Sequence, residues 1–384
     1  MKFLKKLLKG ILVFLGLLIV ALYIFDYDYM LKAVRTIYAK GHKTAYLEDY
    51  KQFDNRTIEN GEGQAWHLHK DYNSVKETAV LEKLNEDKGT IAYVIIKNDS
   101  IWFENYYDGF NKDSKSNSFS MAKSMISAML GKAIMDGKIK SLDQPVGDFY
   151  PEFKDGLAAK MTVGDLSSMA SGLNWDESYY SPFSITTRAY FYDDLEKMML
   201  TVKVTEEPGQ SYKYLSGNTQ LLGMVIEKAT GVKLSNYLSD SFWRPLGAEN
   251  EAYWQIDSEK EGLEKAYCCV ASNARDFARF GKLYKQQGQW NGQQLLDSTF
   301  IAKSIKPRFA KSPEYGYGWW LATHNNKDVF YMRGHLGQLV IVIPEDDLIV
   351  VRLGHLIAKT DLSVGPHSPD FFTYIDEAYK MMDK

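Results

Sequence analysis

The chain has 384 residues, of which 45% are hydrophobic and 25% charged, and its formal net charge is −3. This composition is typical of a folded globular protein and excludes a largely disordered one. A weakly negative chain without a basic stripe is not expected to bind nucleic acid. The sequence also has no glycine-rich phosphate loop and no Cys/His cluster with metal-ligand spacing, so it predicts neither a cofactor nor a metal ion.

The first 25 residues have the charge pattern of a membrane-targeting segment. Four lysines lie within residues 1–9, an apolar run covers residues 10–25, and Asp26 and Asp28 follow. Positive charge before an apolar run predicts a cytoplasmic N-terminus and export of the remainder. No small-x-small cleavage site follows, which favours an uncleaved signal-anchor. We therefore expect a membrane-anchored protein whose main part lies on the periplasmic or extracellular side; the alternative is secretion after signal cleavage.

A mixed segment and then a β-hairpin are expected next. Residues 26–84 predict a tether followed by a partly structured lead-in. Two β-rich runs follow, Ile91 to Ile96 and Ile101 to Tyr106, and the polar residues 97–100 between them predict a hairpin turn.

Residues 118–139 are expected to contain a helix. Apolar residues recur at spacings of three and four from Met121 to Ile134. Ser120 stands at the start of this helix, and Lys123 follows one turn later on the same face. A structural interpretation makes Ser120 an N-cap and leaves Lys123 in water. A chemical interpretation makes Ser120 a nucleophile and Lys123 its base, which requires burial to lower the pKa of the lysine.

The middle of the chain predicts helices and long loops. Three helices are expected to end at Gly172, Gly231 and Gly288, because glycine commonly follows the last helical residue.

Two pairs of adjacent residues in this region allow simple expectations. Arg275 and Asp276 are expected to form a structural ion pair on their helix. Cys268 and Cys269 are expected to be small buried residues, because neighbouring cysteines rarely reach relaxed disulfide geometry.

Strands return near the C-terminus. Residues 327–335, 337–347 and 348–355 are β-rich, and a helix is expected over residues 370–382. Two N-terminal and about three C-terminal strands around a helical insertion fit one antiparallel sheet assembled from both ends of the chain. The predicted fold class is therefore α/β (α+β), with helices flanking the sheet and a helical subdomain.

Three short motifs stand in a fixed order along the chain. They are Ser120-x-x-Lys123, Tyr214-Leu215-Ser216 and His335-Leu336-Gly337. Together they resemble the three motifs of the serine β-lactamase and penicillin-binding protein superfamily. The resemblance is strongest to its class C-like branch, the esterases and the 6-aminohexanoate-dimer hydrolase-like group, and it covers residues 85–384. It implies a β-lactamase/transpeptidase-like serine hydrolase domain.

The resemblance also implies catalytic roles. Ser120 would attack a carbonyl, with Lys123 and Tyr214 managing its proton and Tyr214 protonating the leaving group. An acyl-enzyme would form and then be hydrolysed. The backbone N–H groups of Ser120 and Gln338 would form the oxyanion hole.

Substrate-binding residues are implied in the same way. Ser216, His335 and Gly337 belong to the matched motifs, and Trp175 and Tyr317 are assigned to substrate binding as candidates for lining an apolar pocket. The aromatic residues that could line such a pocket could equally pack in the core. They are Trp175, Tyr179, Tyr180, Tyr317 and Trp319.

Two departures from the superfamily pattern bear on the substrate. Ser216 stands where the pattern has asparagine, and His335 stands where it has lysine. A histidine that is largely neutral near pH 7 is a poor anchor for a carboxylate. The sequence therefore predicts hydrolysis of small esters or amides. The alternatives are a penicillin-binding peptidase or β-lactamase, and a non-catalytic binding or sensor module. The sequence sets no oligomeric state.

Overall fold

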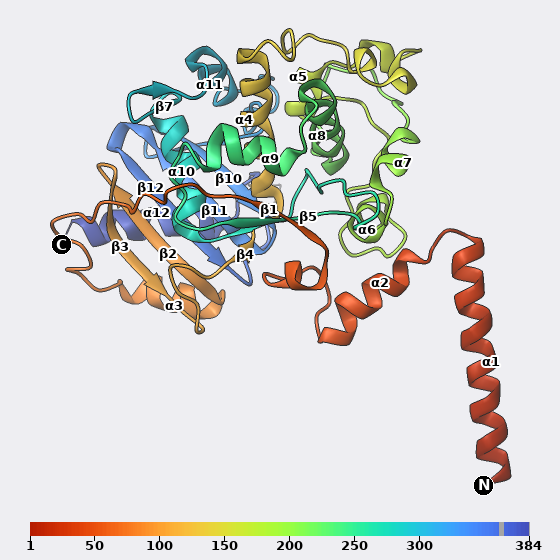
Figure 1. The fold of residues 1–384 in the computed structure, drawn as a ribbon. Helices are drawn as coiled ribbons and strands as arrows, with labels where there is room; N and C mark the ends of the chain where they lie inside the picture. The colour runs from red at the N-terminus through yellow and green to blue at the C-terminus, as the bar shows by residue number, and fades with distance from the viewer. Residues whose placement is uncertain (361–364, 384) are drawn as a thin grey trace.

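A six-stranded antiparallel sheet forms the centre of the molecule (Figure 1). The computed structural model describes residues 1–360 and 365–383. The strand order β3-β2-β12-β11-β10-β9 places the N-terminal hairpin beside the last strand, which confirms a sheet assembled from both chain ends. The strands are β2 Thr90–Lys97, β3 Ser100–Tyr106, β9 Trp320–His324, β10 Lys327–Gly334, β11 Gln338–Ile343 and β12 Leu348–Gly354. The sequence analysis missed edge strand β9.

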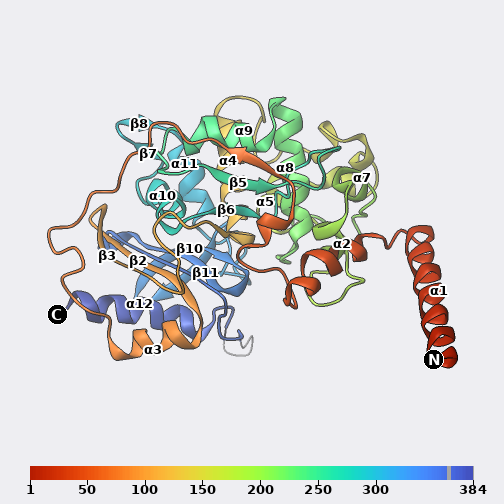
Figure 2. The same ribbon diagram turned by 60° about the horizontal axis from the view of Figure 1, so that its bottom comes forward.

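Both faces of this sheet are covered by helices. Along β2, Tyr93 and Ile95 pack on the side of α3 (Ala79–Asp87) and α12 (Pro369–Met382), which lie together below the sheet in Figure 2. Val94 and Ile96 belong to the larger core on the opposite face. This alternation follows from the two-residue period of a strand.

The larger core joins the sheet to a helical subdomain. At its centre is α4 (Ala122–Met135), of which eleven of 14 residues are buried, so the predicted apolar stripe is in fact part of a helix enclosed on nearly all sides. The other helices of this part are α5 Val163–Ser167, α6 Ile185–Phe191, α7 Leu195–Leu200, α8 Ser216–Thr230, α9 Leu234–Leu238, α10 Ala274–Lys285 and α11 Ser298–Ser304.

The predicted helix ends are only partly correct. Helix α8 stops at Thr230, and Gly231 follows with a φ of 72°, as a glycine C-cap requires. Helix α10 ends three residues before Gly288. Helix α5 ends at Ser167 instead of near Gly172, because Met169 already has a φ of 61°, which a right-handed helix does not allow.

A second, small sheet ties the N-terminal segment to the body. Its strand order is β1-β5-β6-β4, formed by β1 Asn55–Ile58, β5 Ala252–Gln255, β6 Val270–Ser272 and β4 Ser116–Asn117. Beside it, the buried carboxylate of Asp49 accepts hydrogen bonds from Asn117 (2.9 Å) and Gln255 (3.1 Å). Residues 26–84, expected to be a tether and lead-in, therefore contribute packed elements.

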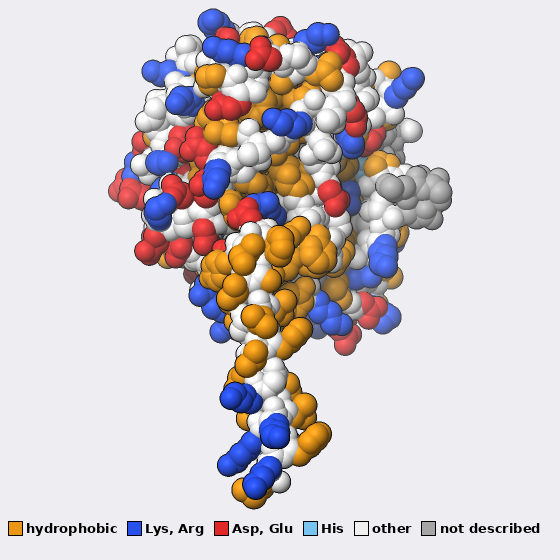
Figure 3. All heavy atoms as spheres, turned by 90° about the vertical axis from the view of Figure 1, so that its right-hand side faces the viewer, with side chains coloured by type: hydrophobic (Ala, Val, Ile, Leu, Met, Phe, Trp, Pro, Cys, Tyr) orange, Lys and Arg blue, Asp and Glu red, His pale blue; other side chains and the backbone are white. Residues whose placement is uncertain are grey.

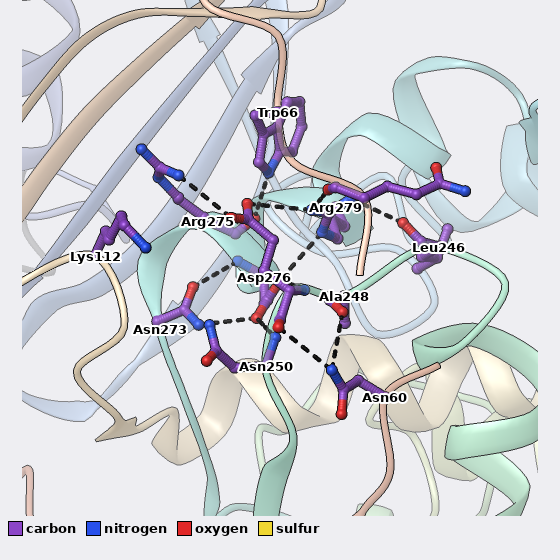
Figure 4. Close-up of polar contacts among 12 residues, drawn as sticks. Asn60, Trp66, Lys112, Leu246, Ala248, Asn250, Asn273, Arg275, Asp276 and Arg279 are labelled. Carbon is purple, nitrogen blue, oxygen red and sulfur yellow. Dashed lines mark hydrogen bonds and ion pairs between the residues drawn. The ribbon is translucent and has the colours of Figure 1, made fainter. Parts of the chain in front are cut away.

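The expected pairing of Arg275 with Asp276 is wrong. Arg275 pairs with Glu104 and Glu249, whereas Asp276 accepts a hydrogen bond from Nε of Arg279 at 3.1 Å (Figure 4). Adjacent residues on a helix point in different directions, so they do not face each other. Asp276 also accepts the backbone N–H of Glu249 at 2.8 Å and thereby holds the loop before β5.

The adjacent cysteines also depart from the expectation. Cys268 and Cys269 are both buried, as expected, but they are joined to each other by a disulfide. Cys269 has a φ of 77°, so the backbone turns sharply between β5 and β6.

An N-terminal helix projects from the body. Helix α1 (Lys2–Ile24) has no buried residue, and it is long and apolar enough to cross a membrane, a property that signal sequences share. Figure 3 shows hydrophobic side chains along this helix and lysines at its free end. Residues 25–28 connect it to α2 (Tyr29–Thr36), which packs against α6.

Candidate active site

Ser120 lies in a tight turn between β4 and α4. The turn is a short 3-10 helix, Phe119–Met121, and Phe119 has a φ of 45°. The backbone N–H of Phe119 is held by the side chain of Asn117 at 2.8 Å. Strand β10 passes close by at Gly334, where a Cβ atom would lie 2.2 Å from the carbonyl oxygen of Ser118. Only glycine allows this close approach between the strand and the serine turn.

Lys123 points from α4 toward Ser120. Its Nζ lies 2.9 Å from Oγ of Ser120, 3.1 Å from Oγ of Ser216 and 2.8 Å from the carbonyl oxygen of Tyr267. Lys123 is only 3% exposed, and burial lowers the pKa of its ammonium to about 8, against the opposing effect of the Glu177 carboxylate. The neutral amine is therefore accessible near physiological pH.

Glu177 completes the polar contacts around Lys123. Its carboxylate accepts the backbone N–H and the hydroxyl of Ser216, both at 2.6 Å, and the hydroxyl of Tyr179, also at 2.6 Å. Ser216 thus bridges Lys123 and Glu177 at the N-terminus of α8. Glu177 was not predicted from the sequence, because it lies far along the chain from the three motifs and no sequence pattern links it to them.

Tyr214 lines the same cavity as Ser120, and its ring lies 5.1 Å from Nζ of Lys123. Burial raises the pKa of the Tyr214 hydroxyl well above its ordinary value, and the Ser120 side chain opposes this shift. The ring packs against Tyr315 and Trp320, which fixes its position. At neutral pH Tyr214 therefore carries its proton.

His335 packs over the same site. Its ring lies 5.6 Å from the rings of Phe119 and Tyr179, and burial lowers its pKa to about 4, so it is neutral at pH 7. Gln338 uses its side-chain amide to bind the carbonyl oxygens of His335 (3.0 Å) and Gly354 (2.7 Å).

Two cavities meet at Ser120. The first, of about 230 Å³, extends toward α2, and we call it the apolar cavity. The second, of about 450 Å³, extends toward β9 and β10, and we call it the polar cavity because the charged side chains of Glu177, Glu314 and Arg333 line it. Ser120, Tyr179 and His335 line both, whereas Tyr214 and Glu177 line only the polar cavity.

The structure does not bring every predicted residue to these cavities. Among the residues that line them in the described part of the chain, Trp175, Tyr317, Gly337 and Gln338 do not occur. Trp175 is buried and donates its indole N–H to Thr186 at 2.8 Å.

Tyr317 has different surroundings. The ring of Tyr317 faces the cations of Lys303 (5.5 Å) and Arg308 (5.8 Å). Its backbone carbonyl accepts the hydroxyl of Ser127 on α4 at 2.6 Å. Trp175 and Tyr317 therefore lie outside the lining of both cavities, while Tyr179 and Tyr180 line the apolar cavity.

The arrangement can support acyl transfer without a metal ion. It places a serine hydroxyl within hydrogen-bond distance of a lysine amine, in a cavity that a protonated tyrosine also lines, and these are the parts that nucleophilic catalysis requires. No group of three or more metal-ligating side chains occurs in residues 1–360 and 365–383.

Fold and motif order agree with one protein family. The model of the beta-lactamase family matches residues 78–356, which is most of the chain. The chain therefore belongs to the beta-lactamase family.

The chain is also similar to individual proteins over most of its length. The chain is 25% identical over 296 residues to the 6-aminohexanoate-dimer hydrolase of Paenarthrobacter ureafaciens, covering 71% of this chain and 74% of that protein. A solved structure of a Bacillus anthracis protein named for the same hydrolase superposes with a TM-score of 0.68 at 22% identity, over 86% and 90% of the two chains. A family VIII carboxylesterase superposes with a TM-score of 0.64 at 17% identity, over 84% and 100%. These two structures share the fold.

Proposed function

We propose that this protein is a serine hydrolase that cleaves small esters or amides through an acyl-enzyme on Ser120. The observation that carries the proposal is the 2.9 Å contact between Nζ of a buried Lys123 and Oγ of Ser120. The names hydrolase and carboxylesterase among the similar proteins agree with this reaction class.

In the first step Ser120 is acylated. The neutral amine of Lys123 takes the hydroxyl proton while Oγ forms a bond to the substrate carbonyl carbon. The resulting oxyanion receives hydrogen bonds from the backbone N–H groups of Ser120 and, as a prediction, of Gln338. The bond to the leaving group then breaks, and the leaving group takes the proton of the Tyr214 hydroxyl. Tyr214 regains a proton from the Lys123 ammonium.

The second step releases the acyl group. Water gives a proton to the neutral amine of Lys123 while its oxygen attacks the ester carbonyl. Collapse of the tetrahedral intermediate returns the proton to Oγ of Ser120. Glu177 holds Ser216 and stays unchanged throughout, so we assign it a positioning role.

We further propose that residues 1–25 anchor the protein in a membrane, that residues 26–84 lead into the body, and that residues 85–384 form the hydrolase domain outside the cytoplasm. The projecting, unburied helix α1 and the lysines at its free end support this orientation.

The test uses the full chain in lipid nanodiscs, with a fluorophosphonate probe and a p-nitrophenyl ester. We expect one phosphonate adduct, on Ser120, and turnover that is abolished by Ser120→Ala. Lys123→Ala should reduce kcat/KM by about 10²–10⁴-fold, the usual contribution of a general base. Lys132→Ala on the same helix serves as the matched control, because Lys132 pairs with Asp136 away from the site.

Two other outcomes would replace the proposal. A stable adduct of a labelled penicillin on Ser120, without ester turnover, would instead indicate a penicillin-binding enzyme. A folded protein whose Ser120 reacts with neither probe would be a binding or sensor module of the same fold.

A further inference from the structure

The two cavities that meet at Ser120 differ in whether Tyr214 lines them. Tyr214 lines the polar cavity and not the apolar one, among the residues that the structure describes. In the proposed reaction Tyr214 protonates the leaving group, so the leaving group occupies the polar cavity. The acyl group on the other side of the carbonyl is then directed into the apolar cavity.

We propose that the substrate is an amphiphile whose acyl part is a hydrocarbon chain, bound in the apolar cavity and entering it from the side of the membrane helix. This inference rests on the proposed hydrolase function and adds the substrate class.

The walls of the apolar cavity carry almost no charge. Helix α2 contributes Met30 and Ala33, and Phe119 and Phe191 contribute aromatic surface from the body. Within the described residues that line it, Lys43 is the only side chain charged at neutral pH, and it is exposed. Apolar cavities of this kind bind hydrocarbon groups, because neither the cavity wall nor the hydrocarbon gives up hydrogen bonds to water on binding.

The mouth of the cavity is apolar as well. Val34, Tyr38 and Tyr180 line it and are each more than half exposed. Phe183 is 69% exposed and packs edge-on against Tyr27, in the segment between α1 and α2. Exposed apolar side chains that surround a cavity mark a ligand or membrane contact.

The position of α2 connects this mouth to the membrane. Only residues 25–28 separate the end of α1 from the start of α2, whose side chains form one wall of the cavity. The Asp26–Arg188 ion pair and the hydrogen bond from the Tyr29 hydroxyl to the carbonyl oxygen of Pro182 (2.8 Å) hold this connection against the α6 region. If α1 spans a bilayer, the mouth lies close to its surface, where tyrosine side chains are favoured.

The first arm of the test measures chain-length dependence with the full chain in nanodiscs. For p-nitrophenyl acetate, butyrate, hexanoate and octanoate, kcat/KM should rise about fourfold per added methylene until the cavity is full, which corresponds to about 0.8 kcal/mol per buried methylene. Met30→Trp fills the apolar cavity and should flatten this series. Leu31→Trp is the matched control, because Leu31 neighbours Met30 on α2 but lines a different surface cavity.

The second arm does not depend on turnover. Octanamide should raise the unfolding temperature of Ser120→Ala and of Ser120→Ala/Leu31→Trp, and acetamide at the same concentration should not. The shift should be lost in Ser120→Ala/Met30→Trp. An octanoyl glycerolipid placed in the nanodisc, compared with the dissolved octanoate ester, shows whether the chain comes from the bilayer or from solution.

The outcomes separate the two claims. Absence of a fluorophosphonate adduct on Ser120 contradicts the hydrolase function, and octanamide binding then still decides whether the cavity accepts a hydrocarbon chain. If the probe labels Ser120 but kcat/KM does not rise along the ester series, the acyl-chain inference alone is overturned. The same holds if kcat/KM rises along the series and Met30→Trp leaves that rise unchanged.

Discussion

Burial of Lys123 has a direct consequence for the pH dependence of hydrolysis. Burial lowers its pKa to about 8, and only the neutral amine can accept the Ser120 proton. We therefore expect kcat/KM for a neutral ester to rise with pH up to about 8 and to level off above it. A pH–rate profile measures this. Lys123→Arg should lose the activity at every pH, because a guanidinium does not deprotonate; a wild-type profile that is flat through this range would contradict the role of Lys123.

Glu177 should shift the same profile. Its carboxylate raises the pKa of Lys123, so Glu177→Gln should move the midpoint of the pH–rate profile to lower pH. A purely structural role would reduce activity at all pH values without moving the midpoint. Glu314→Gln is the control, since Glu314 lines the same cavity and does not contribute to the shift of Lys123. An unshifted midpoint in Glu177→Gln would contradict the electrostatic effect of Glu177 on Lys123.

At the scale of elements, the start of α8 depends on a close contact with Trp175. A Cβ atom on Gly217 would lie 2.4 Å from the Trp175 ring. Gly217→Ala should therefore lower the free energy of unfolding by about 1–3 kcal/mol, the usual cost of overpacking. Denaturant unfolding measures the change. When Gly217→Ala is introduced into Trp175→Leu, it should lower the unfolding free energy by much less than it does in the wild type. Equal losses in the two backgrounds would show that the two sites are not in contact.

Helix α10 depends on the buried carboxylate of Asp276. It accepts hydrogen bonds from the side-chain amide of Asn273, from the backbone N–H of Asn250 at 3.1 Å and from Nε of Arg279 (Figure 4). Asp276→Ala leaves the buried Arg279 cation without this partner, and we expect a loss of about 3 kcal/mol in unfolding free energy. Thermal or urea unfolding tests this. Asp240→Ala, which removes an exposed ion pair with Arg244, should change stability by less than about 1 kcal/mol.

For the whole molecule, α1 and α2 should behave differently on truncation. Helix α1 buries no residue, so removal of residues 1–25 should leave the unfolding free energy unchanged and release the protein from membranes. Removal of residues 1–40 also deletes Tyr29, Ala33 and Ile37 from their cluster with Phe53 and Phe191, and should be destabilising. Membrane sedimentation and urea unfolding measure both effects. A full-length chain that does not sediment with membranes would contradict the anchoring role of α1. Equal stability of the two truncated proteins would contradict the structural role of α2.

Local patterns were sufficient for much of the architecture. The β-rich run of β2 and the turn at Asn98 and Asp99, both with positive φ, lie within a few residues of each other, and the hairpin was predicted correctly. The contact between Ser120 and Lys123 was also predictable, because residues three apart on a helix lie on one face. The pairing of this hairpin with the C-terminal strands followed from the order of elements.

Contacts across long chain separations were not predictable from such patterns. Glu177 reaches Ser216 over 39 residues, and no periodicity connects them. Trp175 and Tyr317 carried an aromatic signal but lie outside the lining of both cavities, because a large ring suits a core as well as a cleft. The second oxyanion donor, Gln338, stays a prediction.

The sequence by itself determined the strands and helices whose side chains repeat with a regular period, and the order of the three motifs. Only the tertiary structure decided that Lys123 is desolvated, that Glu177 joins it, and that α2 forms a wall of an apolar cavity beside Ser120. The reason is physical: periodicity depends on near neighbours, whereas burial, pKa shifts and cavities depend on which distant segments pack around a group.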